Sequence, residues 1–519
     1  MTRVLNLGQI VAAHARNHPE RIGARDSRRA LTFSRWNSRA CRLANALTGL
    51  GLEKGDRVAV LAHNRVEWME IYVALAKAGL VAVPVNFRLV APEIRYIAEH
   101  CDARALIVED VLSDRVEGLR GELAIHASGW IRLGESAAPG WKTYEALLAE
   151  ASDAEPDAMV HSTDTWALMY TSGTTGKPKG AIRNHHGSAL ISLVTALDMG
   201  FTRDDVALLV MPMCHANSLY FSFTFTYLGA TCVVDDRAHF DPQALLATMA
   251  GERITFTSLV PTHYIMALGL PDNVKASYDV THVRKLMISS APARKDTKLG
   301  ILEYFSNSDL YELYGSTEAG WVTLLRPDEQ IEHLGSVGRE WTGSAAVKIL
   351  DPARREVPDG EIGELFSCTP YTFDGYLNDP VKTAEALHGG YCSVGDMARR
   401  DEEGFIHLVD RKSNMIISGG ENVYPSEIEN ILGRYPGVKD VAIVGVPHEK
   451  WGEAVHAVIV MHQGRLASEM ELLEWCKDKM AGYKRPRSVT FVTESEMPRT
   501  ATGKILHRVL RDMLSRAKG

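Results

Sequence analysis

The sequence predicts an α/β fold with largely parallel sheets, followed by a β-rich layer and a compact α+β module. Apolar runs of strand length alternate with amphipathic helical segments up to about residue 290. From about Ser336 short β-rich pieces alternate with Gly and Pro, and past Asp410 a denser α+β pattern appears. At 519 residues the chain is too long for one core, and its length suggests about three domains.

The alternation occurs twice, which predicts two doubly wound sheets. In the first unit the expected helices are Leu31–Leu50, Val66–Lys77 and Pro92–Cys101, and the expected strands are Arg57–Ala62, Val81–Val85, Arg104–Val108 and Trp166–Met169. In the second unit the expected strands are Ala207–Met211, Thr231–Val234, Ile254–Leu259 and Lys285–Ser289, and the expected helices are Leu219–Leu228, Pro242–Ala250 and Thr262–Leu268.

The last third of the chain is expected to hold a small β-barrel or β-layer and then an α+β domain. The layer would contain strands Ala346–Leu350, Ile362–Ser367 and Phe405–Val409. The domain would contain helix Pro425–Leu432, strands Val441–Val446 and Val455–Met461, helix Glu469–Met480 and a final helix from Lys504.

The charge of the chain argues against a protein that coats nucleic acid. The formal net charge is −8. Of the residues, 45% are hydrophobic and 24% are charged, as in ordinary globular proteins. The segment Arg411–Gly519 carries 17 Lys and Arg against 13 Asp and Glu, so it is mildly basic beside an acidic body. Either a phosphate-rich ligand reaches this segment or the difference is chance variation of a solvated surface.

Cysteine usage and apolar segments predict a cytoplasmic protein without a transmembrane segment. The seven cysteines are odd in number and scattered without a CxxC pair, which fits a reducing compartment and no structural zinc. The N-terminus lacks the apolar core of a signal peptide. Val206–Val234 contains no charged residue, but Pro212, Gly229 and several polar residues interrupt it, so we expect strand, loop, buried helix and strand.

The stretch YTSGTTGKPKG, Tyr170 to Gly180, has the composition of a phosphate-binding loop. It follows an apolar run and combines three glycines, four hydroxyl residues and two lysines. Glycines let backbone N–H groups approach an anion, hydroxyls donate hydrogen bonds, and lysines add charge. It is not a Walker A loop because the GxxxxGK[ST] spacing is absent. A mobile surface turn is the alternative for such a loop taken alone.

Four further stretches join this loop: YELYGSTEAG (Tyr311 to Gly320), YCSVGDMA (Tyr391 to Ala398), DRKSNMIISGGENVYPSEIE (Asp410 to Glu429) and PRTATGKI (Pro498 to Ile505). In this order and spacing the five stretches resemble the adenylate-forming superfamily, which includes acyl-CoA and aryl-CoA synthetases, and the resemblance spans nearly the whole chain.

The resemblance implies an N-terminal domain over residues 1–410, with two doubly wound sheets and a small β-barrel, and a mobile C-terminal lid over residues 411–519. It also implies ATP, Mg²⁺ and coenzyme A as cofactors and a small carboxylic acid as substrate. The carboxylate would attack the α-phosphate of ATP to give acyl-AMP and pyrophosphate, and the thiol of coenzyme A would then displace AMP. Protein and metal would supply positioning and charge neutralisation.

Residue roles follow from the resemblance by position. Glu318 would ligate Mg²⁺, and Lys504, Glu318 and Thr171 would act in catalysis. Lys504 would reach the α-phosphate only with the lid closed. The nucleotide would be held by Thr171, Ser172, Gly173, Thr174, Thr175, Gly176, Lys179, Ser290, Ala291, Tyr314, Gly315, Ser316, Thr317, Asp396, Arg411 and Lys504. Among these, Tyr314 would stack on adenine, and Asp396 and Arg411 would bind the ribose.

The coenzyme A site and the hinge are also expected in the C-terminal part. Gly419 and Gly420 resemble the loop that lines the pantetheine tunnel, and Trp451 and Lys484 would contact coenzyme A, although a solvated basic face explains the lysine equally well. The hinge position is usually Asp or Lys in this superfamily and is Ser413 here. A small polar residue can still absorb the backbone rotation.

The acid itself is expected to be neutral and apolar, because no Arg stands beside the glycine of YGST to pair a second carboxylate. The expected acyl pocket is formed by His215, Asn217, Phe221, Ser289, Gly315, Trp321 and Trp341. This lining suits an aryl acid or a medium- or long-chain fatty acid, and core packing is the alternative explanation for the aromatic residues.

Two rival functions remain open at this stage. An adenylating enzyme with another acceptor, such as a carrier protein, would release pyrophosphate without coenzyme A. A non-catalytic member of the fold would have lost the reactive positions, yet Glu318, Asp396, Arg411 and Lys504 are all present. The assembly state is open as well, with a homodimer among the candidates.

Overall fold

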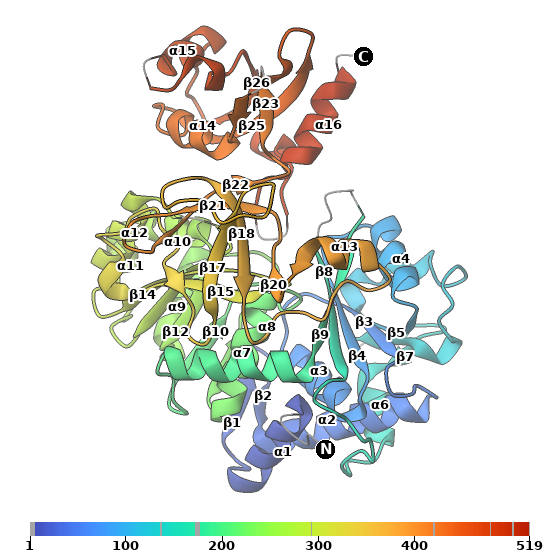
Figure 1. Ribbon diagram of the computed structural model, residues 1–519. Helices are drawn as coiled ribbons and strands as arrows, with labels where there is room; N and C mark the ends of the chain where they lie inside the picture. Colours follow the sequence, from blue (N-terminus) through green and yellow to red (C-terminus); the bar gives the residue numbers. More distant parts are fainter. Residues whose placement is uncertain are drawn as a thin grey trace. The chain divides into compact units, whose positions relative to one another are not determined.

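The fold was analysed in a computed structural model of the chain (Figure 1). It describes residues 6–134, 138–171, 177–291, 293–418, 421–477, 479–500 and 503–517, with residues 515–517 described by their backbone alone.

A seven-stranded sheet forms from the first part of the chain. In sheet order its strands are β7 (Lys142–Thr143), β6 (Trp130–Leu133), β5 (Ala103–Glu109), β3 (Arg57–Leu61), β4 (Val81–Val85), β8 (Thr165–Thr171) and β9 (Lys179–Asn184). All neighbours are parallel except β8 and β9, which form an antiparallel pair. The helices connecting or flanking these strands are α2 (Phe33–Gly49), α3 (Glu67–Ala78), α4 (Ala91–His100), α5 (Asp114–Glu117) and α6 (Tyr144–Glu150).

A nine-stranded sheet forms the second layer. In sheet order its strands are β16 (Arg339–Glu340), β15 (Gly320–Leu325), β14 (Asp309–Ser316), β13 (Lys285–Ser289), β12 (Phe256–Leu259), β10 (Val206–Leu209), β11 (Thr231–Val234), β1 (Ile22–Arg25) and β2 (Ala30–Thr32). Its helices are α1 (Leu7–Asn17), α7 (His185–Asp198), α8 (Ala216–Leu228), α9 (Pro242–Gly251), α10 (Pro261–Leu268), α11 (Asp272–Lys275) and α12 (Lys295–Tyr304).

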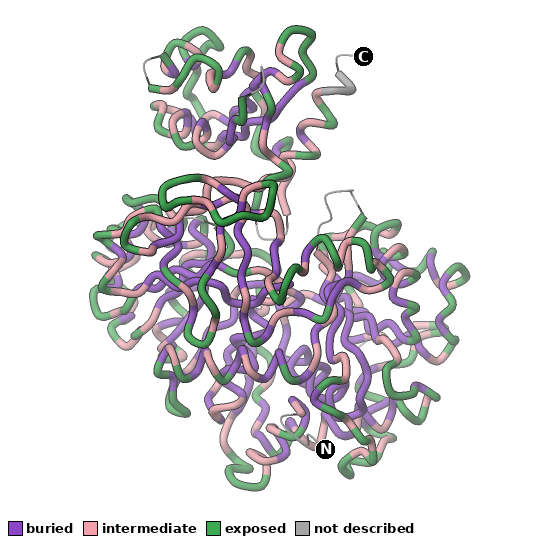
Figure 2. Tube along the Cα trace, viewed as in Figure 1, coloured by how far each residue is buried: buried purple, intermediate pink, exposed green. Residues whose placement is uncertain are grey.

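The two sheets share one core between them and have a separate core on each outer face. In β3, Val58 and Val60 belong to the shared core, whereas Ala59 and Leu61 enter the core that includes α4. In β10, Leu208 enters the core that includes α9 and α10. Successive side chains of a strand point to opposite faces, so strands buried on both faces read as continuous apolar runs. The inner strands β3, β4 and β13 are accordingly buried at all or all but one of their positions, and buried residues lie mainly in the interior of the chain trace (Figure 2).

The predicted α/β alternation is confirmed. Strands Val81–Val85, Thr231–Val234 and Lys285–Ser289 have the predicted bounds, and the other predicted strands and helices of these two sheets differ by one to three residues at an end. The remaining elements of the two sheets were not predicted. The uncharged stretch from Val206 to Val234 is β10, a loop, the buried helix α8 and β11, as expected. Within the described ranges no helix is long and apolar enough to cross a membrane.

The β-rich layer expected after Ser336 is an antiparallel sheet. Its strands are β17 (Ala345–Leu350), β18 (Gly363–Cys368), β19 (Leu387–His388), β20 (Tyr391–Cys392), β21 (Asp396–Arg400) and β22 (Ile406–Arg411), with helix α13 (Pro380–Ala386) before β19. The strand order is β19-β20-β18-β21-β22, and β17 pairs with β18.

The C-terminal module is a mixed sheet with apolar cores on both faces. Its strands are β23 (Ile416–Ser418), β24 (Glu421–Val423), β25 (Val438–His448), β26 (Gly452–Met461) and β27 (Ser488–Phe491), and its helices are α14 (Pro425–Leu432), α15 (Glu469–Trp475) and α16 (His507–Ala517). Along β25, Val441 and Ile443 enter one core, and Ala442 and Val444 enter the other.

Two predicted helix ends in this module are wrong. Helix α15 ends at Trp475 rather than Met480. The carbonyl oxygen of its last residue, Trp475, accepts a hydrogen bond from the Lys479 ammonium (3.0 Å). Helix α16 begins at His507 rather than Lys504, because the backbone N–H and C=O of Lys504 are hydrogen-bonded to Thr500 and not within a helix. Amphipathic spacing cannot reveal such side-chain contacts.

The chain divides into two compact units. One contains Met1–Ala346 and Ser367–Cys392, and the other contains Val347–Phe366 and Ser393–Gly519. The functional boundary expected between residues 410 and 411 stays a prediction.

Candidate active site

The predicted phosphate loop connects the antiparallel strands β8 and β9. Thr171 pairs with Lys179 and Tyr170 with Gly180, so the loop leaves and re-enters the sheet at adjacent positions. Five residues with predicted nucleotide contacts lie outside the described residues: Ser172, Gly173, Thr174, Thr175 and Gly176.

Helix α4 holds both ends of this loop. The His100 Nδ1 atom lies 2.7 Å from the Tyr170 hydroxyl, and the Tyr96 hydroxyl donates to the Pro178 carbonyl oxygen (3.3 Å). A Cβ at Gly180 would lie 3.2 Å from the Tyr170 ring, so glycine suits this close approach. The anchoring holds the two strand ends that carry Thr171 and Lys179.

Glu318 is the centre of a buried polar cluster at the base of the loop. Its Oε1 atom accepts hydrogen bonds from the Thr171 hydroxyl (3.0 Å) and the Tyr376 hydroxyl (2.8 Å). The Lys179 ammonium lies 3.9 Å from the centroid of the Tyr376 ring. An isolated bridge between Ala181 and Tyr376 brings the segment before α13 beside β9. Three segments far apart in the sequence therefore meet at one carboxylate.

The electrostatics of this cluster fit a divalent cation. Glu318 is 5% exposed and, across the part of the chain that the structure describes, no Lys or Arg nitrogen lies within 4 Å of its carboxylate. A buried carboxylate without a paired cation is costly. The described residues also contain no cluster of three or more His, Cys, Asp or Glu that could hold a metal. Mg²⁺ commonly binds one or two carboxylates and completes its shell with phosphate oxygens and water, which matches this donor set.

Burial lowers the pKa of Lys179, and the nearby Glu318 carboxylate partly opposes this shift. The lysine is half-buried on β9, on the same face of the strand as Ala181 and Arg183. Its charge is therefore held close to the loop in a medium that screens it less than water does.

The turn that carries Glu318 joins β14 to β15. Gly320 has φ +73°, and a Cβ there would lie 2.5 Å from the buried Tyr371 ring. A Cβ at Gly315 would lie 2.3 Å from the Gly320 carbonyl oxygen. Both positions require glycine for close backbone approach. The Ser316 hydroxyl accepts from the Ala319 N–H (2.9 Å) and closes the turn that also contains Thr317.

The residues expected around adenine lie at the ends of neighbouring parallel strands. Ser290 and Ala291 follow β13, and Tyr314 lies in β14 beside it. Ser290 has φ +69°, in the left-handed region that few residues other than glycine adopt. Strained backbone of this kind is concentrated at functional sites.

Two groups of expected acyl-pocket residues come together. The Asn217 amide donates to the hydroxyls of Ser258 and Ser289, both at 2.9 Å, and joins α8 to β12 and β13. Ser258 was not expected from the sequence. All three side chains are buried.

The aromatic group contains Phe221, Trp321 and Trp341. The Trp321 ring centroid lies 5.6 Å from that of Phe221 and 6.3 Å from that of Trp341, and the Trp321 indole donates to the Thr195 hydroxyl (2.9 Å).

His215, another expected acyl-pocket residue, is uncharged. Burial, with a smaller contribution from Arg88, lowers the pKa of His215 to about 4, so its imidazole is neutral near pH 7.

In the second unit the structure brings Asp396 and Arg411 together. They are cross-strand partners in β21 and β22, and the Arg411 Nε atom lies 3.0 Å from Asp396 Oδ1. Asp410 accepts from the N–H groups of Arg411 (2.6 Å) and Ser426 (2.9 Å). Ser413, the expected hinge, is exposed in the turn that follows β22.

Lys504 has an exposed side chain, and its backbone is held by Thr500. The Thr500 N–H donates to the Lys504 carbonyl oxygen (2.7 Å), and the Lys504 N–H donates to the Thr500 hydroxyl (3.1 Å). The Arg499 guanidinium binds the Gly503 carbonyl oxygen (2.8 Å) and forms an ion pair with Asp440 of β25. These contacts hold the backbone at Lys504 to the sheet of the C-terminal module.

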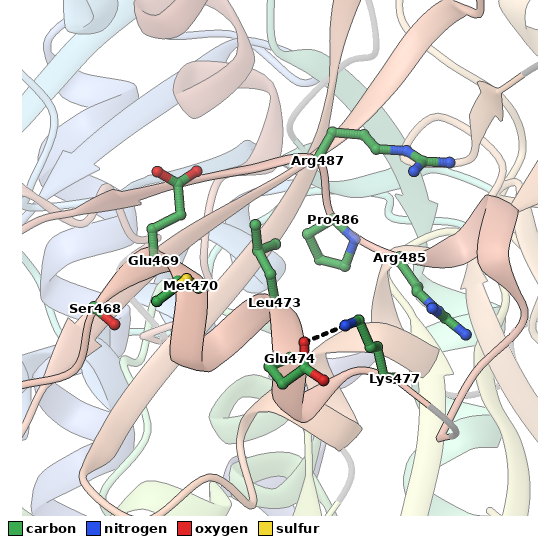
Figure 3. A pocket seen from close by; sticks show the side chains of 9 residues that line it. All are labelled: Ser468, Glu469, Met470, Leu473, Glu474, Lys477, Arg485, Pro486 and Arg487. Atoms are coloured by element: carbon green, nitrogen blue, oxygen red, sulfur yellow. Dashed lines mark ion pairs between the residues drawn. The ribbon is translucent and has the colours of Figure 1, made fainter.

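The residues expected to contact coenzyme A differ in their surroundings. Gly419 and Gly420 lie outside the described residues. The charged groups of Lys450 and Arg487 lie 4.8 and 5.5 Å from the centroid of the Trp451 ring, whereas Lys484 forms an ion pair with Glu427. A pocket of about 660 Å³ also lies in this unit (Figure 3). It is lined by Ser468, Glu469, Met470, Leu473, Glu474, Lys477, Arg485, Pro486 and Arg487.

Two residues at the Glu318 site were missed by the sequence analysis, Tyr376 and Arg183. Arg183 is 1% exposed, and its guanidinium donates to backbone carbonyl oxygens of the Glu318 turn. The only signal in the sequence is that Arg183 follows the apolar pair Ala181 and Ile182 of β9. Tyr376 gives none, since it lies far along the chain from the loop.

Comparison with known proteins identifies the class. The model of the AMP-binding enzyme family matches residues 11–377, and that of the AMP-binding enzyme C-terminal domain matches residues 427–504. A feruloyl-CoA synthase from Amycolatopsis sp is 36% identical over 96% of this chain and 97% of its own. A long-chain-fatty-acid–CoA ligase from Mycobacterium tuberculosis is 34% identical over 93% of both. The crystal structure of an anthranilate CoA ligase with anthranoyl-AMP superimposes with a TM-score of 0.89 at 27% identity, covering 99% of this chain and 98% of that one.

The fold and the site thus define an adenylate-forming ligase, and the chain belongs to the AMP-binding enzyme family. It is an AMP-forming acyl-CoA synthetase, which uses ATP, Mg²⁺ and coenzyme A to convert a carboxylic acid into its thioester through an acyl-AMP.

Proposed function

We propose that this synthetase activates a hydrophobic acid, with an aryl acid favoured, and that the Glu318 cluster holds the Mg²⁺–ATP phosphates. The observation that carries the proposal is the buried Glu318 carboxylate, which accepts from the hydroxyls of Thr171 and Tyr376. The Lys179 ammonium is nearby, but within the described ranges no Lys or Arg nitrogen lies within 4 Å of the carboxylate. When bound, Mg²⁺ neutralises charge on the phosphate oxygens. Glu318 would supply its protein ligand, and Thr171 and Lys179 would hold the β- and γ-phosphates with the loop above them.

The adenylation step then needs positioning more than proton transfer. The substrate carboxylate is itself the nucleophile at the α-phosphorus, pyrophosphate leaves, and the charge that develops on the phosphoryl oxygens must be stabilised. Tyr314 would stack on adenine, and the strained Ser290 and Ala291 would border it together with Gly315, Ser316 and Thr317. These groups would fix the nucleotide so that a carboxylate enters in line.

The second unit would supply the other groups. Asp396 and Arg411 are already paired and would bind the ribose hydroxyls, and Lys504 would stabilise the α-phosphate. We propose that residues 411–519 move as a lid, with Ser413 as the hinge, since this residue is exposed in a turn between β22 and β23. Gly419, Gly420, Trp451 and Lys484 would then serve coenzyme A. The cations beside Trp451 support a role in binding its phosphates.

An aryl acid is favoured because the expected acyl lining is aromatic and closely packed. Phe221, Trp321 and Trp341 are each at most 5% exposed. The feruloyl-CoA synthase relative and the anthranilate CoA ligase structure act on aryl acids by their names. The fatty-acid ligase relative keeps a long-chain acid as the second candidate.

We also propose a cytoplasmic location. The seven cysteines are all unpaired, which supports it.

The function is tested by acid-dependent ATP–pyrophosphate exchange and by thioester formation with coenzyme A. We expect exchange with a hydrophobic acid and, after coenzyme A is added, stoichiometric AMP and acyl-CoA. Exchange without thioester formation would indicate a different acceptor. Absence of exchange with every acid tested, under conditions where the protein remains folded, would refute the proposed function.

A further inference from the structure

Arg183 is a buried cation that the catalytic scheme does not use. It lies in β9, is 1% exposed, and no carboxylate lies within 4 Å of its guanidinium in the described part of the chain. Burying a charge without a paired opposite charge is expensive. The hydrogen bonds of such a side chain are therefore expected to hold particular groups in position.

The hydrogen bonds of Arg183 converge on the turn that carries Glu318. Its Nη1 atom donates to the carbonyl oxygens of Thr317 (3.2 Å) and Glu318 (3.1 Å), and its Nη2 atom donates to the carbonyl oxygen of Tyr371 (2.7 Å). One rigid guanidinium therefore binds the backbone of the turn and the backbone of the segment that leads to Tyr376. Its planar geometry favours such simultaneous contacts, which the single ammonium of lysine cannot reproduce.

Two further hydrogen bonds hold the carbonyl groups of consecutive residues in the same turn, Glu318 and Ala319. The Phe373 N–H donates to the Glu318 carbonyl oxygen (2.8 Å), and the Thr369 hydroxyl donates to that of Ala319 (2.6 Å). The guanidinium also lies 5.5 Å from the centroid of the Tyr220 ring. Arg183 thus connects the phosphate-loop strand, the Glu318 turn and the Tyr371–Tyr376 segment.

We propose that Arg183 is a positioning residue that sets the Glu318 carboxylate for Mg²⁺–ATP. This inference rests on the proposed function, because Glu318 must be the metal ligand. Partners that orient a metal ligand commonly change metal affinity or activity by about 10–100-fold when they are removed. The effect should appear in Mg²⁺ and ATP affinity and not in the affinity for the acid, since the hydrogen bonds of Arg183 end on the Glu318 turn and on Tyr371 and not on the expected acyl-pocket residues.

The test compares Arg183→Gln and Arg183→Lys with two other variants. Thr369→Val removes the hydroxyl bond to the Ala319 carbonyl of the same turn with little change in volume. Arg65→Gln is the matched control, since Arg65 is also a buried arginine (5% exposed) but binds Glu67, Glu109 and the Leu133 carbonyl oxygen. For each we would measure the melting temperature, the Mg²⁺ dependence of pyrophosphate exchange, the KM for acid, and ATP binding at fixed Mg²⁺ by calorimetry without acid.

We expect Arg183→Gln to raise the Mg²⁺ requirement and weaken ATP binding by about tenfold or more, with an unchanged KM for acid. Arg183→Lys should recover only part of the loss, and Thr369→Val should shift the same quantities in the same direction by less. Arg65→Gln should lower the melting temperature alone. Unchanged Mg²⁺ and ATP affinities in Arg183→Gln would overturn the proposal. If that variant does not fold, unchanged affinities in both Arg183→Lys and Thr369→Val would do so.

Failure of the proposed function gives a different result. A wild-type protein that shows no exchange with any acid would contradict the ligase assignment, while calorimetry with Mg²⁺–ATP would still decide whether Arg183 affects nucleotide binding.

Discussion

At the scale of single residues, one carboxylate lies at the centre of the proposed nucleotide site. Glu318 is reached by hydroxyls from β8 and from the segment before α13, and Lys179 lies over the ring of Tyr376. The two hydroxyl bonds are 3.0 and 2.8 Å long and end on a buried carboxylate, so small chemical changes should have measurable effects. Hydrogen bonds to charged groups contribute about 1.5–3 kcal/mol.

Tyr376→Phe is the sharpest change at this site. It removes the hydroxyl that donates to Glu318 and keeps the ring beside Lys179. Loss of one charge-assisted hydrogen bond predicts a decrease in kcat/KM for adenylation of about tenfold or more. Pyrophosphate exchange measures this directly. Tyr304→Phe removes the hydroxyl of a half-buried tyrosine that donates to the Lys275 carbonyl oxygen (3.1 Å), and it serves as the control. Equal rates for Tyr376→Phe and wild type would show that the Tyr376 hydroxyl has no role in adenylation.

Lys504→Ala separates the two half-reactions. If its ammonium stabilises the α-phosphate only during adenylation, acyl-AMP formation should fall by about 10²–10³-fold. Thioester formation from supplied acyl-AMP should remain close to wild type. The two assays are run on the same preparation, with Lys477→Ala, another lysine of the C-terminal module, as control. An equal loss in both assays would contradict the role.

At the scale of secondary-structure elements, the turn between β14 and β15 depends on its backbone geometry. Gly320→Ala forces a Cβ onto a residue with φ +73° and to within 2.5 Å of the buried Tyr371 ring. We expect a loss of stability above about 1 kcal/mol, a lower melting temperature and weaker pyrophosphate exchange. Gly343→Ala is the matched control, since Gly343 has φ +86° but a Cβ added there would meet no atom within 4 Å. A difference between the two variants isolates the clash, and identical behaviour would refute it.

In the C-terminal module, the contact between α14 and α16 should respond to pH. His507 Nε2 lies 2.6 Å from Glu429 Oε1, which also accepts from the Ile443 N–H (2.8 Å). Burial alone would lower the pKa of His507, but Glu429 raises it above the usual 6.5, with Asp410 adding and Lys504 opposing. A raised folded-state pKa stabilises the module below pH 6.5, and this contribution is lost as the pH rises through the raised value.

His507→Gln should therefore be most destabilising at low pH. We expect the difference in melting temperature between wild type and variant to be largest near pH 6 and to shrink as the pH rises above the raised pKa. Thermal unfolding at several pH values checks this, and His126→Gln on an exposed turn is the control. A difference that does not change with pH would show that the pair is not charged.

At the scale of the whole molecule, the sheets and helices bring an aromatic set to the place expected for the acid. A panel of benzoates, cinnamates and fatty acids, assayed by kcat/KM with ATP and coenzyme A, should favour aryl acids. Each buried CH₂ contributes about 0.8 kcal/mol, so a pocket open to alkyl chains would give roughly fourfold per carbon until its floor is reached. A steady rise through long-chain acids would support the fatty-acid alternative instead.

Much of this architecture could be predicted from local sequence. The strand and helix alternation is confirmed because a strand buried on both faces must be apolar throughout, as at Val81–Val85. The identities of Glu318 and Thr171 as site candidates came from resemblance, and their contact is a finding of the structure. The ends of α15 and α16 could not be predicted, since side chains such as those of Lys479 and Thr500 set them.

The sequence alone thus determined the class of fold, because hydrophobic periodicity is written along the chain, and its five motifs determined the superfamily by resemblance. Only the tertiary structure decided that Tyr376 and Arg183 belong with Glu318, that Asn217 joins Ser258 and Ser289, and that Asp396 is paired with Arg411. These contacts connect segments that are distant in sequence, and folding places them together through the packing of whole sheets, which no local pattern encodes.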